Sequence, residues 1–372
     1  MRFKVLIIIL LISKGAIFGQ ETILDNPEIQ VKIQTCLQSI YNYDFSLANQ
    51  KLLEIENQIP GHPVCSFLEG LKIYWENMPL LSEDPQTDEF LKSMEESISI
   101  ASNMLKKNPN SIEGIFFDLH ARAFIAMFWA DNGKPSKVIK DIDNLYRRTM
   151  QGIDLKNIFN EFFFSSGLYS YYIDAYVDLH PVYKPIAKLF RKGDKENGLK
   201  ELQQAIDSST YMAVESLLFM SLLQLNYEKN MIGALEYAAI LHNNCPANTY
   251  YTGHYLMILL YQNEFELAVS VLQKLELNED DFSEMIRIIM QGFILENYLN
   301  NSNDAEENYM KGIAQADKFG PFTHIYQAIA YAGLSRIYNT REEPRLARRY
   351  RKKSKALSKY EFILAYHQQS SL

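Results

Sequence analysis

The sequence predicts an all-α protein, an α-α superhelix (solenoid) of about seven to eight antiparallel helix pairs. Glycine and proline are scarce, at 16 and 12 of 372 residues, which favours long helices over a many-turned β architecture. Small residues recur at the interval of a helix pair, and apolar residues repeat around them at offsets of three and four. Because no change in composition marks a linker, residues 20–372 are predicted to form a single domain.

Residues 1–19 are predicted to be a cleaved signal peptide. Arg2 and Lys4 precede an apolar run over residues 5–12, and small residues surround a cleavage point after Gly19. This run is too short to cross a hydrocarbon core of ~30 Å. We therefore expect an exported protein, periplasmic or secreted, that begins at Gln20. An uncleaved anchor or interfacial helix is the alternative.

The chain is acidic, with 37 Lys and Arg against 45 Asp and Glu and a net charge of −8. Loss of Arg2, Lys4 and Lys14 with the signal peptide lowers this by 3, to −11. Nucleic-acid binding needs clustered cations that face phosphate groups. The composition therefore argues against a general nucleic-acid binder.

Four alanines mark the period. Ala234, Ala268, Ala305 and Ala347 follow one another at intervals of 34, 37 and 42 residues, each early in a helical segment that comes after a polar turn. Apolar or small residues recur around them on the same helix face, most regularly over residues 211–355. A bulky side chain at these positions would force the paired helices apart, at a cost of ~1–3 kcal/mol.

This pattern resembles the tetratricopeptide repeat family, whose unit is two antiparallel helices of about 34 residues. The same frame fits Ala48, and it fits less well at Val138 and Gly198, where the alanine is replaced. A second helix of one unit is expected at residues 194–208, and a poorly matching helix at residues 87–107. The resemblance implies divergent repeats of an exported bacterial type, stacked into a solenoid with a concave and a convex face.

The middle of the chain departs from the period. Residues 154–178 are predicted to form one long, aromatic-rich helix, followed by an irregular insertion over residues 183–192. The aromatic residues occupy nearly every face, which is typical of a helix enclosed by neighbours. An aromatic ligand box is the alternative.

The sequence contains no recognisable catalytic, metal or cofactor motif. The seven histidines are scattered, without an HExxH arrangement or a pair at i and i+4. A GxSxG elbow is absent, and residues 193–198 lack the lysine and the hydroxyl residue of a phosphate loop. We therefore predict no enzyme, no metal and no cofactor. An enzyme whose site is dispersed along the chain is the least favoured alternative, and a deep pocket with converging titratable groups would support it.

Cys36, Cys65 and Cys245 have no metal-ligand spacing. We interpret them as buried free thiols, with a Cys36–Cys65 disulfide as the alternative.

Four tyrosines occupy one phase of the repeat. Tyr41, Tyr227, Tyr261 and Tyr298 each lie seven residues before an in-phase alanine. The resemblance implies that this phase borders a concave groove that binds an extended or helical peptide. The predicted groove residues are Tyr41, Phe219, Leu223, Tyr227, Met257, Leu260, Tyr261, Met290, Ile294 and Tyr298. The alternative is that the tyrosines seal the helix ends against the next unit.

A basic capping helix is predicted over residues 344–367. Between residues 341 and 360, nine cations stand against two acids. The predicted basic patch consists of Arg345, Arg348, Arg349, Arg351, Lys352 and Lys353. Such a patch suits an anionic membrane surface or an acidic partner, and a solvated outer cap is the alternative.

Taken together, these features favour a non-enzymatic scaffold of the cell envelope that binds a protein or peptide through the concave face. Membrane or acidic-partner docking through the basic helix is the alternative function.

Overall fold

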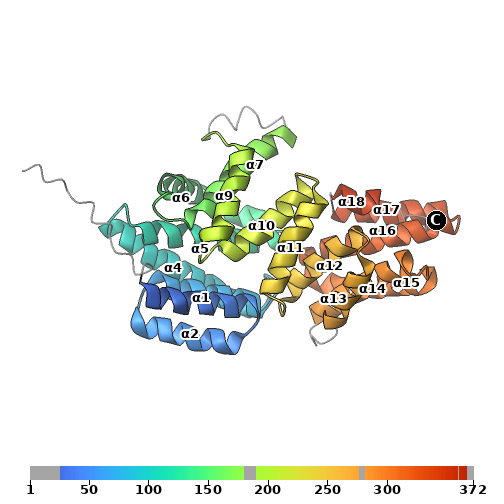
Figure 1. Cartoon of the computed structure of the whole chain (residues 1–372), viewed down its shortest axis with the longest axis horizontal. Coiled ribbons are helices and arrows are strands. Elements are labelled where there is room, and N and C mark those ends of the chain that lie inside the picture. The colour runs from blue at the N-terminus through green and yellow to red at the C-terminus, as the bar shows by residue number, and fades with distance from the viewer. Residues whose placement is uncertain (1–25, 180–189, 276–280, 359, 367–372) are drawn as a thin grey trace, which may run out of the picture.

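The computed structural model describes residues 26–179, 190–275, 281–358 and 360–366, and every regular element among them is a helix. The helices follow one another as antiparallel pairs, each packed on the next (Figure 1). The pairs are α1 (Pro27–Tyr41) with α2 (Phe45–Gln58), α3 (Pro63–Glu76) with α4 (Gln86–Lys107), α5 (Ile112–Asp131) with α6 (Ile142–Leu155), α7 (Phe162–Leu179) with α9 (Lys195–Ser208), α10 (Ala213–Asn226) with α11 (Met231–Asn244), α12 (Thr249–Tyr261) with α13 (Phe265–Leu275), α14 (Asp281–Asn297) with α15 (Ser302–Ala316), and α16 (His324–Thr340) with α17 (Pro344–Leu357). Two 3-10 helices, η2 (Pro135–Asp141) and η4 (Asp317–Thr323), precede α6 and α16, and α18 (Glu361–Ala365) ends the described chain. The predicted all-α solenoid is confirmed.

The turn inside each regular pair repeats its backbone conformation. Tyr43, Lys229, Asn263, Asn300 and Glu342 all have a positive φ, between 53° and 63°. Each stands five residues before an in-phase alanine. L-residues rarely adopt this left-handed conformation outside turns. Its recurrence at one phase shows that the pairs are structural repeats.

The in-phase alanines lie where paired helices cross. Ala48, Ala234, Ala268 and Ala305 are fully buried, and Ala347 is 6% exposed. In three pairs a small polar side chain of the first helix donates to the alanine carbonyl: the donors are Cys36 Sγ (3.7 Å), Ser221 Oγ (2.8 Å) and Ser335 Oγ (2.8 Å). Such short contacts between helices leave no room for a larger side chain, as the period predicts.

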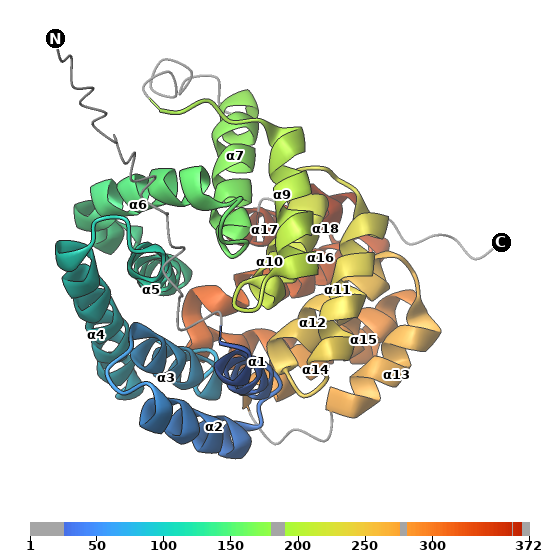
Figure 2. The same ribbon diagram turned by 60° about the vertical axis from the view of Figure 1, so that its left-hand side comes forward.

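The first turn of the superhelix closes on itself (Figure 2). The Tyr41 hydroxyl at the end of α1 donates to Glu215 Oε1 in α10 over 3.0 Å. Asn248 Nδ2, at the start of α12, donates to the Tyr41 carbonyl over 2.9 Å, and the Ala247 amide donates to Asn42 Oδ1 over 3.1 Å. The first pair is therefore a direct neighbour of the fifth and sixth pairs.

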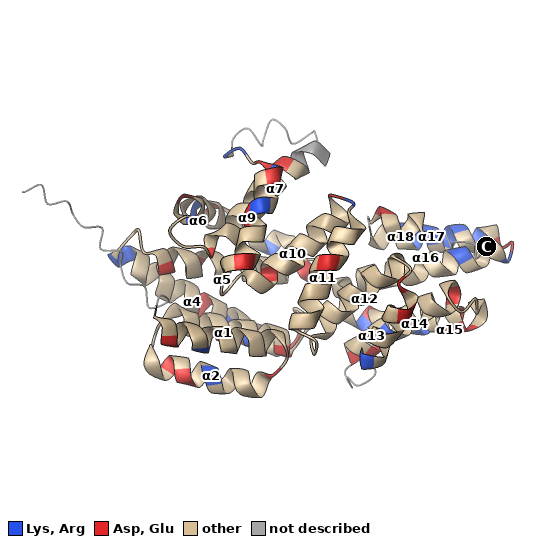
Figure 3. Cartoon of the chain, in the orientation of Figure 1, with Lys and Arg blue, Asp and Glu red and all other residues tan. Residues whose placement is uncertain are grey.

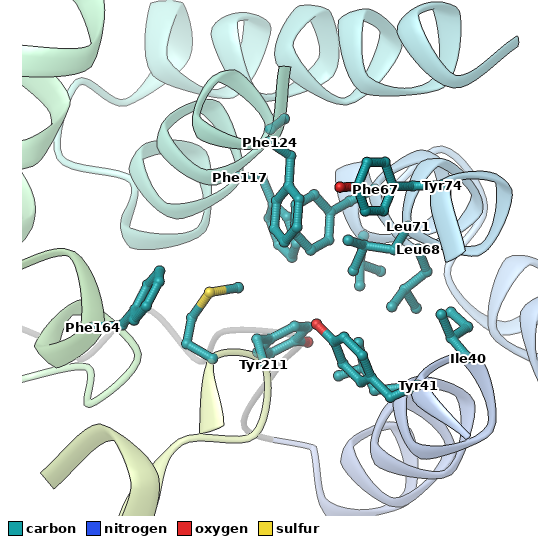
Figure 4. Packing of buried hydrophobic residues seen from close by; sticks show 14 of the residues in the cluster. Ile40, Tyr41, Phe67, Leu68, Leu71, Tyr74, Phe117, Phe124, Phe164 and Tyr211 are labelled. Carbon is teal, nitrogen blue, oxygen red and sulfur yellow. The ribbon is translucent and has the colours of Figure 1, made fainter. Parts of the chain in front are cut away.

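Aromatic side chains fill the interior of this closed turn. Figure 4 shows residues of α1, α3, α5 and α7 pointing toward one another across it. The Phe67 and Phe117 rings are 5.6 Å apart, and Tyr211 lies 5.9 Å from Phe117 and 5.2 Å from Phe116. Edge-to-face contacts at these distances stabilise a core beyond the burial of apolar area. Most of the concave side is therefore core and not open groove.

Three sequence-based boundaries need correction. The helix predicted over residues 154–178 is two helices, because α6 ends at Leu155 and α7 begins at Phe162. The turn between them directs Glu161 to the amides of Thr210, Tyr211 and Met212, so it caps the start of α10, which has no side-chain cap of its own.

The other two corrections concern η2 and the C-terminus. Val138 lies in η2, and Ile139 and Ile142 beside it are 66% and 57% exposed, so the third pair does not follow the repeat there. The basic capping helix predicted over residues 344–367 ends at Leu357, and the short α18 follows. The predicted insertion at residues 183–192 lies mostly outside the described residues. The predicted signal peptide, residues 1–19, lies entirely outside them.

The predicted helices at residues 87–107 and 194–208 correspond to α4 and α9. Cys36, Cys65 and Cys245 are buried free thiols, as interpreted from the sequence. None of the helices in the described part of the chain is long and apolar enough to span a membrane.

Candidate functional site

The residues predicted to line a groove are mostly core residues. Seven of them, Tyr41, Leu223, Met257, Leu260, Tyr261, Met290 and Ile294, are at most 8% exposed. Phe219 and Tyr227 are half-buried, and Tyr298 is 43% exposed. Apart from Met257, which also lines a cavity, these side chains lie in the packing between helices. The structure therefore does not bring the ten residues together as one open binding surface.

The in-phase tyrosines pack against neighbouring elements. Tyr227 lies edge-on to Tyr171, with ring centroids 5.7 Å apart, and Tyr261 lies 5.1 Å from Phe293. Tyr298 stacks on Phe265 at 5.1 Å. This arrangement matches the alternative interpretation, in which the tyrosines seal the helix ends.

A cavity of about 420 Å³ lies inside the superhelix where the closed first turn meets the last helix pairs. Its walls come from the end of α5, from α10 and α12, from η4 and the start of α16, and from the chain after α17. The lining residues are Ala130, Asp131, Leu222, Tyr250, His254, Met257, Pro321, Phe322, His324, Ile325, Tyr326, Leu357, Ser358 and Tyr360. Its volume falls in the range of ligand sites, and it is partly open to solvent.

The cavity depends on a contact between distant segments. The turn after α5 approaches η4 so closely that a Cβ on Gly133 would lie 3.2 Å from Pro321 Cγ. Gly133 also has a φ of +69°, a conformation that glycine adopts without strain. This turn and η4 therefore meet in the cavity wall.

Asp131 is the acidic group of the cavity. Its Oδ2 accepts a long hydrogen bond of 3.4 Å from the Tyr74 hydroxyl. Among the described residues, no lysine or arginine lies within ion-pair distance of this carboxylate. Burial raises the pKa of Asp131 to about 6, and the Tyr74 hydrogen bond opposes that rise. The described part of the chain thus places a carboxylate in the cavity without a compensating cation.

The backbone beside Asp131 is held in place by Asn132. The Asn132 amide donates to the carbonyls of Leu80 and Phe128 over 3.2 and 3.0 Å, and its oxygen accepts from the Ser82 amide over 2.8 Å. These bonds join the end of α5 to the segment before α4. Asp131 therefore lies on a rigid part of the cavity wall.

His254 is a neutral acceptor in the cavity wall. Ser221 Oγ donates its proton to the Ala234 carbonyl over 2.8 Å, so it accepts from His254 Nε2, which is 2.8 Å away. The His254 ring therefore carries its proton on Nε2, and Nδ1 carries none. Burial lowers the pKa of His254 to about 4, which keeps the ring neutral at pH 7. Because the Ser221 hydroxyl is committed to a carbonyl and fully buried, this serine–histidine pair is structural.

Three tyrosines complete the polar part of the cavity. Burial raises the pKa of Tyr250 well above its usual value, and Asp131, Tyr326 and Tyr360 contribute to the same rise through their proximity. Tyr360 accepts a hydrogen bond from Asn226 over 3.3 Å. A Cβ on Gly253 would lie 2.7 Å from the Tyr326 hydroxyl, so the absence of a side chain there makes room for that group.

No protein-family model matches the chain, and no curated protein is similar to it in sequence. The resemblance to tetratricopeptide repeats therefore stays a prediction from the period. Within the described residues, no three His, Cys, Asp or Glu side chains gather as a group that could hold a metal ion.

The predicted basic patch lies on the exposed side of α17. Arg345, Arg348, Arg349, Arg351, Lys352 and Lys353 are all exposed. The helix sequence PRLARRYRKKSKAL contains no acid, and Figure 3 shows the cations gathered along α17. Lys353 lies over the rings of Tyr331 and Tyr350, at 4.7 and 5.9 Å. The structure thus brings these six residues together on one helix.

No local pattern in the sequence indicates the cavity. Asp131 follows an apolar helix and precedes a turn, which is the usual context of a solvated helix end. Tyr250, His254 and Tyr326 lie in helical segments without a binding or catalytic motif. Only the contact between elements more than 180 residues apart places these groups around one space.

Proposed function

We propose that this protein is a non-enzymatic, exported binding protein that holds a peptide or protein partner by inserting one of its side chains into the interior cavity. The observation that supports the proposal is the cavity itself, because it lies on the concave side of the solenoid and combines apolar walls with convergent polar groups. Aromatic core fills the interior of the closed first turn. Recognition at one cavity therefore replaces the continuous groove expected from the sequence.

Binding fits the cavity better than catalysis does. Asp131 has Tyr74 as its hydrogen-bond partner, and His254 has Ser221. Neither group shares its proton with an activated nucleophile, which acid–base or nucleophilic catalysis would require. These partners favour binding over the enzyme alternative.

The test is selection from a random peptide library with the purified chain, followed by a cavity-blocking variant. Ala130 is exposed at the cavity rim, so Ala130→Trp adds an indole there with little effect on the core. Ser46→Trp, at an exposed position of α2, is the matched control. The proposal expects selected peptides to lose at least tenfold in affinity with Ala130→Trp and to bind Ser46→Trp normally. Equal binding by both variants would place recognition elsewhere.

A second candidate function is docking on an anionic membrane surface through α17, because its six predicted cations are exposed and the helix contains no acid. Each cation near such a surface contributes about 1 kcal/mol, and salt screens this attraction. Sedimentation with phosphatidylserine vesicles should therefore weaken steeply with salt. Reversal of Arg348, Arg349 and Lys352 to Glu should abolish sedimentation.

The matched control reverses the exposed Lys92, Lys106 and Lys107 of α4 to Glu, which changes the net charge equally. If both triple variants lose sedimentation to the same extent, net charge and not α17 is responsible, and the membrane candidate fails.

A further inference from the structure

The cavity contains an acidic group that the fold does not neutralise. Asp131 is the last residue of α5 and so lies at the negative end of the helix dipole, where a carboxylate is disfavoured. It is largely buried, and among the described residues Tyr74 is its hydrogen-bond partner. Withdrawal of a carboxylate from water without a cation is costly. A cation from outside the chain that pairs with the Asp131 carboxylate would explain its position in the cavity.

From this placement we infer that the cavity binds an alkylammonium group, which forms an ion pair with Asp131. The inference rests on the proposed function and names the chemical class of the inserted group. Two sources carry this chemistry: a lysine side chain of a peptide partner and a free small amine.

The remaining walls suit the same group. Tyr250, Tyr326 and Tyr360 line the cavity with Phe322, and the faces of aromatic rings attract cations. The His254 ring is neutral and leaves Nδ1 as an acceptor. An ammonium group donates up to three hydrogen bonds and accepts none. The carboxylate, the aromatic rings and the acceptor that line the cavity are therefore complementary to it.

The apolar part of the cavity matches an alkyl chain. Leu222, Met257, Ile325 and Leu357 belong to the lining together with the polar groups. Met257 is an adaptable side chain that packs against flexible ligands. A lysine side chain offers four methylene groups before its charge, so it would bury its stem on these residues and place its ammonium at Asp131.

The experiment is isothermal titration calorimetry at pH 7.5 and low salt, with the full chain and three probes. The probes are the acetylated and amidated peptide Gly-Lys-Gly, the same peptide with norleucine in place of lysine, and 1,4-diaminobutane. The variant Asp131→Asn removes the charge and keeps the shape of the side chain. Asp143→Asn, at an exposed position of α6, is the control with the same change in net charge.

We expect the lysine peptide to bind wild type and Asp143→Asn equally, and to bind Asp131→Asn at least tenfold more weakly. The norleucine peptide should bind wild type at least tenfold more weakly than the lysine peptide. Binding of 1,4-diaminobutane with the same dependence on Asp131 would identify a free amine as sufficient. If the lysine peptide binds and 1,4-diaminobutane does not, the ammonium group comes from a lysine of a peptide partner.

Two outcomes would overturn the inference. Equal binding of the norleucine and lysine peptides, or unchanged binding by Asp131→Asn, would show that the cavity does not select an ammonium group, although the proposed function would stand. Absence of binding by every probe would also reject the ammonium inference. The proposed function is judged separately by the library selection and Ala130→Trp, which do not depend on these probes. Far-UV circular dichroism and the unfolding midpoint verify that Asp131→Asn is folded.

Discussion

The Tyr41 hydroxyl donates to the Glu215 carboxylate over 3.0 Å and joins two residues that are 174 positions apart in the chain. Both side chains are buried, at 1% and 2% exposure. This bond connects the first helix pair to the fifth, whereas stacking in a simple solenoid connects only successive pairs. The closed turn, the aromatic interior and the cavity all depend on this contact between distant pairs.

Removal of the Tyr41 hydroxyl should weaken the closure. Tyr41→Phe leaves Glu215 buried without its donor, which we expect to lower the free energy of unfolding by about 1–3 kcal/mol. Urea denaturation measures this loss. Hydrogen exchange should increase in both α1 and α10.

Tyr309→Phe is the matched control, because the Tyr309 hydroxyl donates to Glu296 over 2.7 Å within a single pair, α14 and α15. Its effect on exchange should be confined to the C-terminal pairs. If Tyr41→Phe leaves exchange in α10 unchanged, the first and fifth pairs are not coupled in solution.

The contribution of Glu215 to stability should fall as the pH rises from about 4.5 to above 7. Burial raises the pKa of Glu215 from 4.5 to about 7, opposed by the Tyr41 hydrogen bond and reinforced by Asp131. The folded state therefore holds the proton more tightly than the unfolded state. Protonated Glu215 makes its full contribution to the free energy of unfolding below pH 4.5. This contribution, about 3 kcal/mol, is lost as the pH rises through 7.

Glu215→Gln should remove this contribution from the profile, because the amide does not ionise and its oxygen can still accept from Tyr41. Unfolding midpoints in urea between pH 4 and pH 8 measure the effect. The exposed Glu236, also in the fifth pair, gives the control Glu236→Gln. Wild-type and Glu215→Gln profiles that run parallel over this range would contradict the buried position of Glu215.

Asn248 has two roles that one substitution can separate. Its Oδ1 caps α12 by accepting from the Tyr251 amide over 3.1 Å, and its Nδ2 donates to the Tyr41 carbonyl. Asn248→Asp keeps the cap and loses the donor, which should cost about 1–3 kcal/mol because a buried carbonyl is left next to a carboxylate.

Chemical denaturation measures the cost, with Asn230→Asp as the control, since Asn230 caps α11 and its own donated bond, to Gln224, is exposed and contributes little. Equal stability of Asn248→Asp and Asn230→Asp would mean that the bond to Tyr41 contributes nothing.

The cavity wall should be sensitive to volume at Gly253. Gly253→Ala places a methyl group 2.7 Å from the Tyr326 hydroxyl and 3.0 Å from Ile286 Cδ1. Overpacking of this kind costs about 1–3 kcal/mol. Tyr326→Phe removes the hydroxyl, so the double variant should recover part of the loss, and the two effects should not add. Thermal unfolding of the two single variants and the double variant measures the coupling. If the two changes in stability are strictly additive, the two residues are not in contact.

The repeated part of the fold could be predicted from the sequence because its signal is local. Ala234, Ala268 and Ala305 are fully buried at helix crossings, as their spacing indicates. The positive-φ turn five residues earlier also recurs with the alanine. Each of these features depends on residues within one helix pair, so a period in the sequence is sufficient to reveal it.

The candidate site could not be predicted in the same way. The position of Met290 in the repeat suggested a groove, but Met290 is fully buried in the packing between pairs. Asp131 and Tyr326 meet at one cavity because the superhelix returns on itself after five pairs. That return depends on the summed angles between pairs and on contacts such as Tyr41 with Glu215, none of which leaves a pattern at short range.

Closure of the first turn is tested most directly by crosslinking between the first pair and the start of α12. Asn42 Oδ1 accepts from the Ala247 amide over 3.1 Å, so cysteines at these two positions would be neighbours. The native thiols are buried, which limits their reaction with the reagent. In dilute protein treated with a short bis-maleimide, Asn42→Cys with Ala247→Cys should give an intramolecular crosslink by mass spectrometry, and Asn42→Cys with Asn303→Cys should not. If both pairs instead react as separate thiols, the first turn is open and the cavity does not form as described.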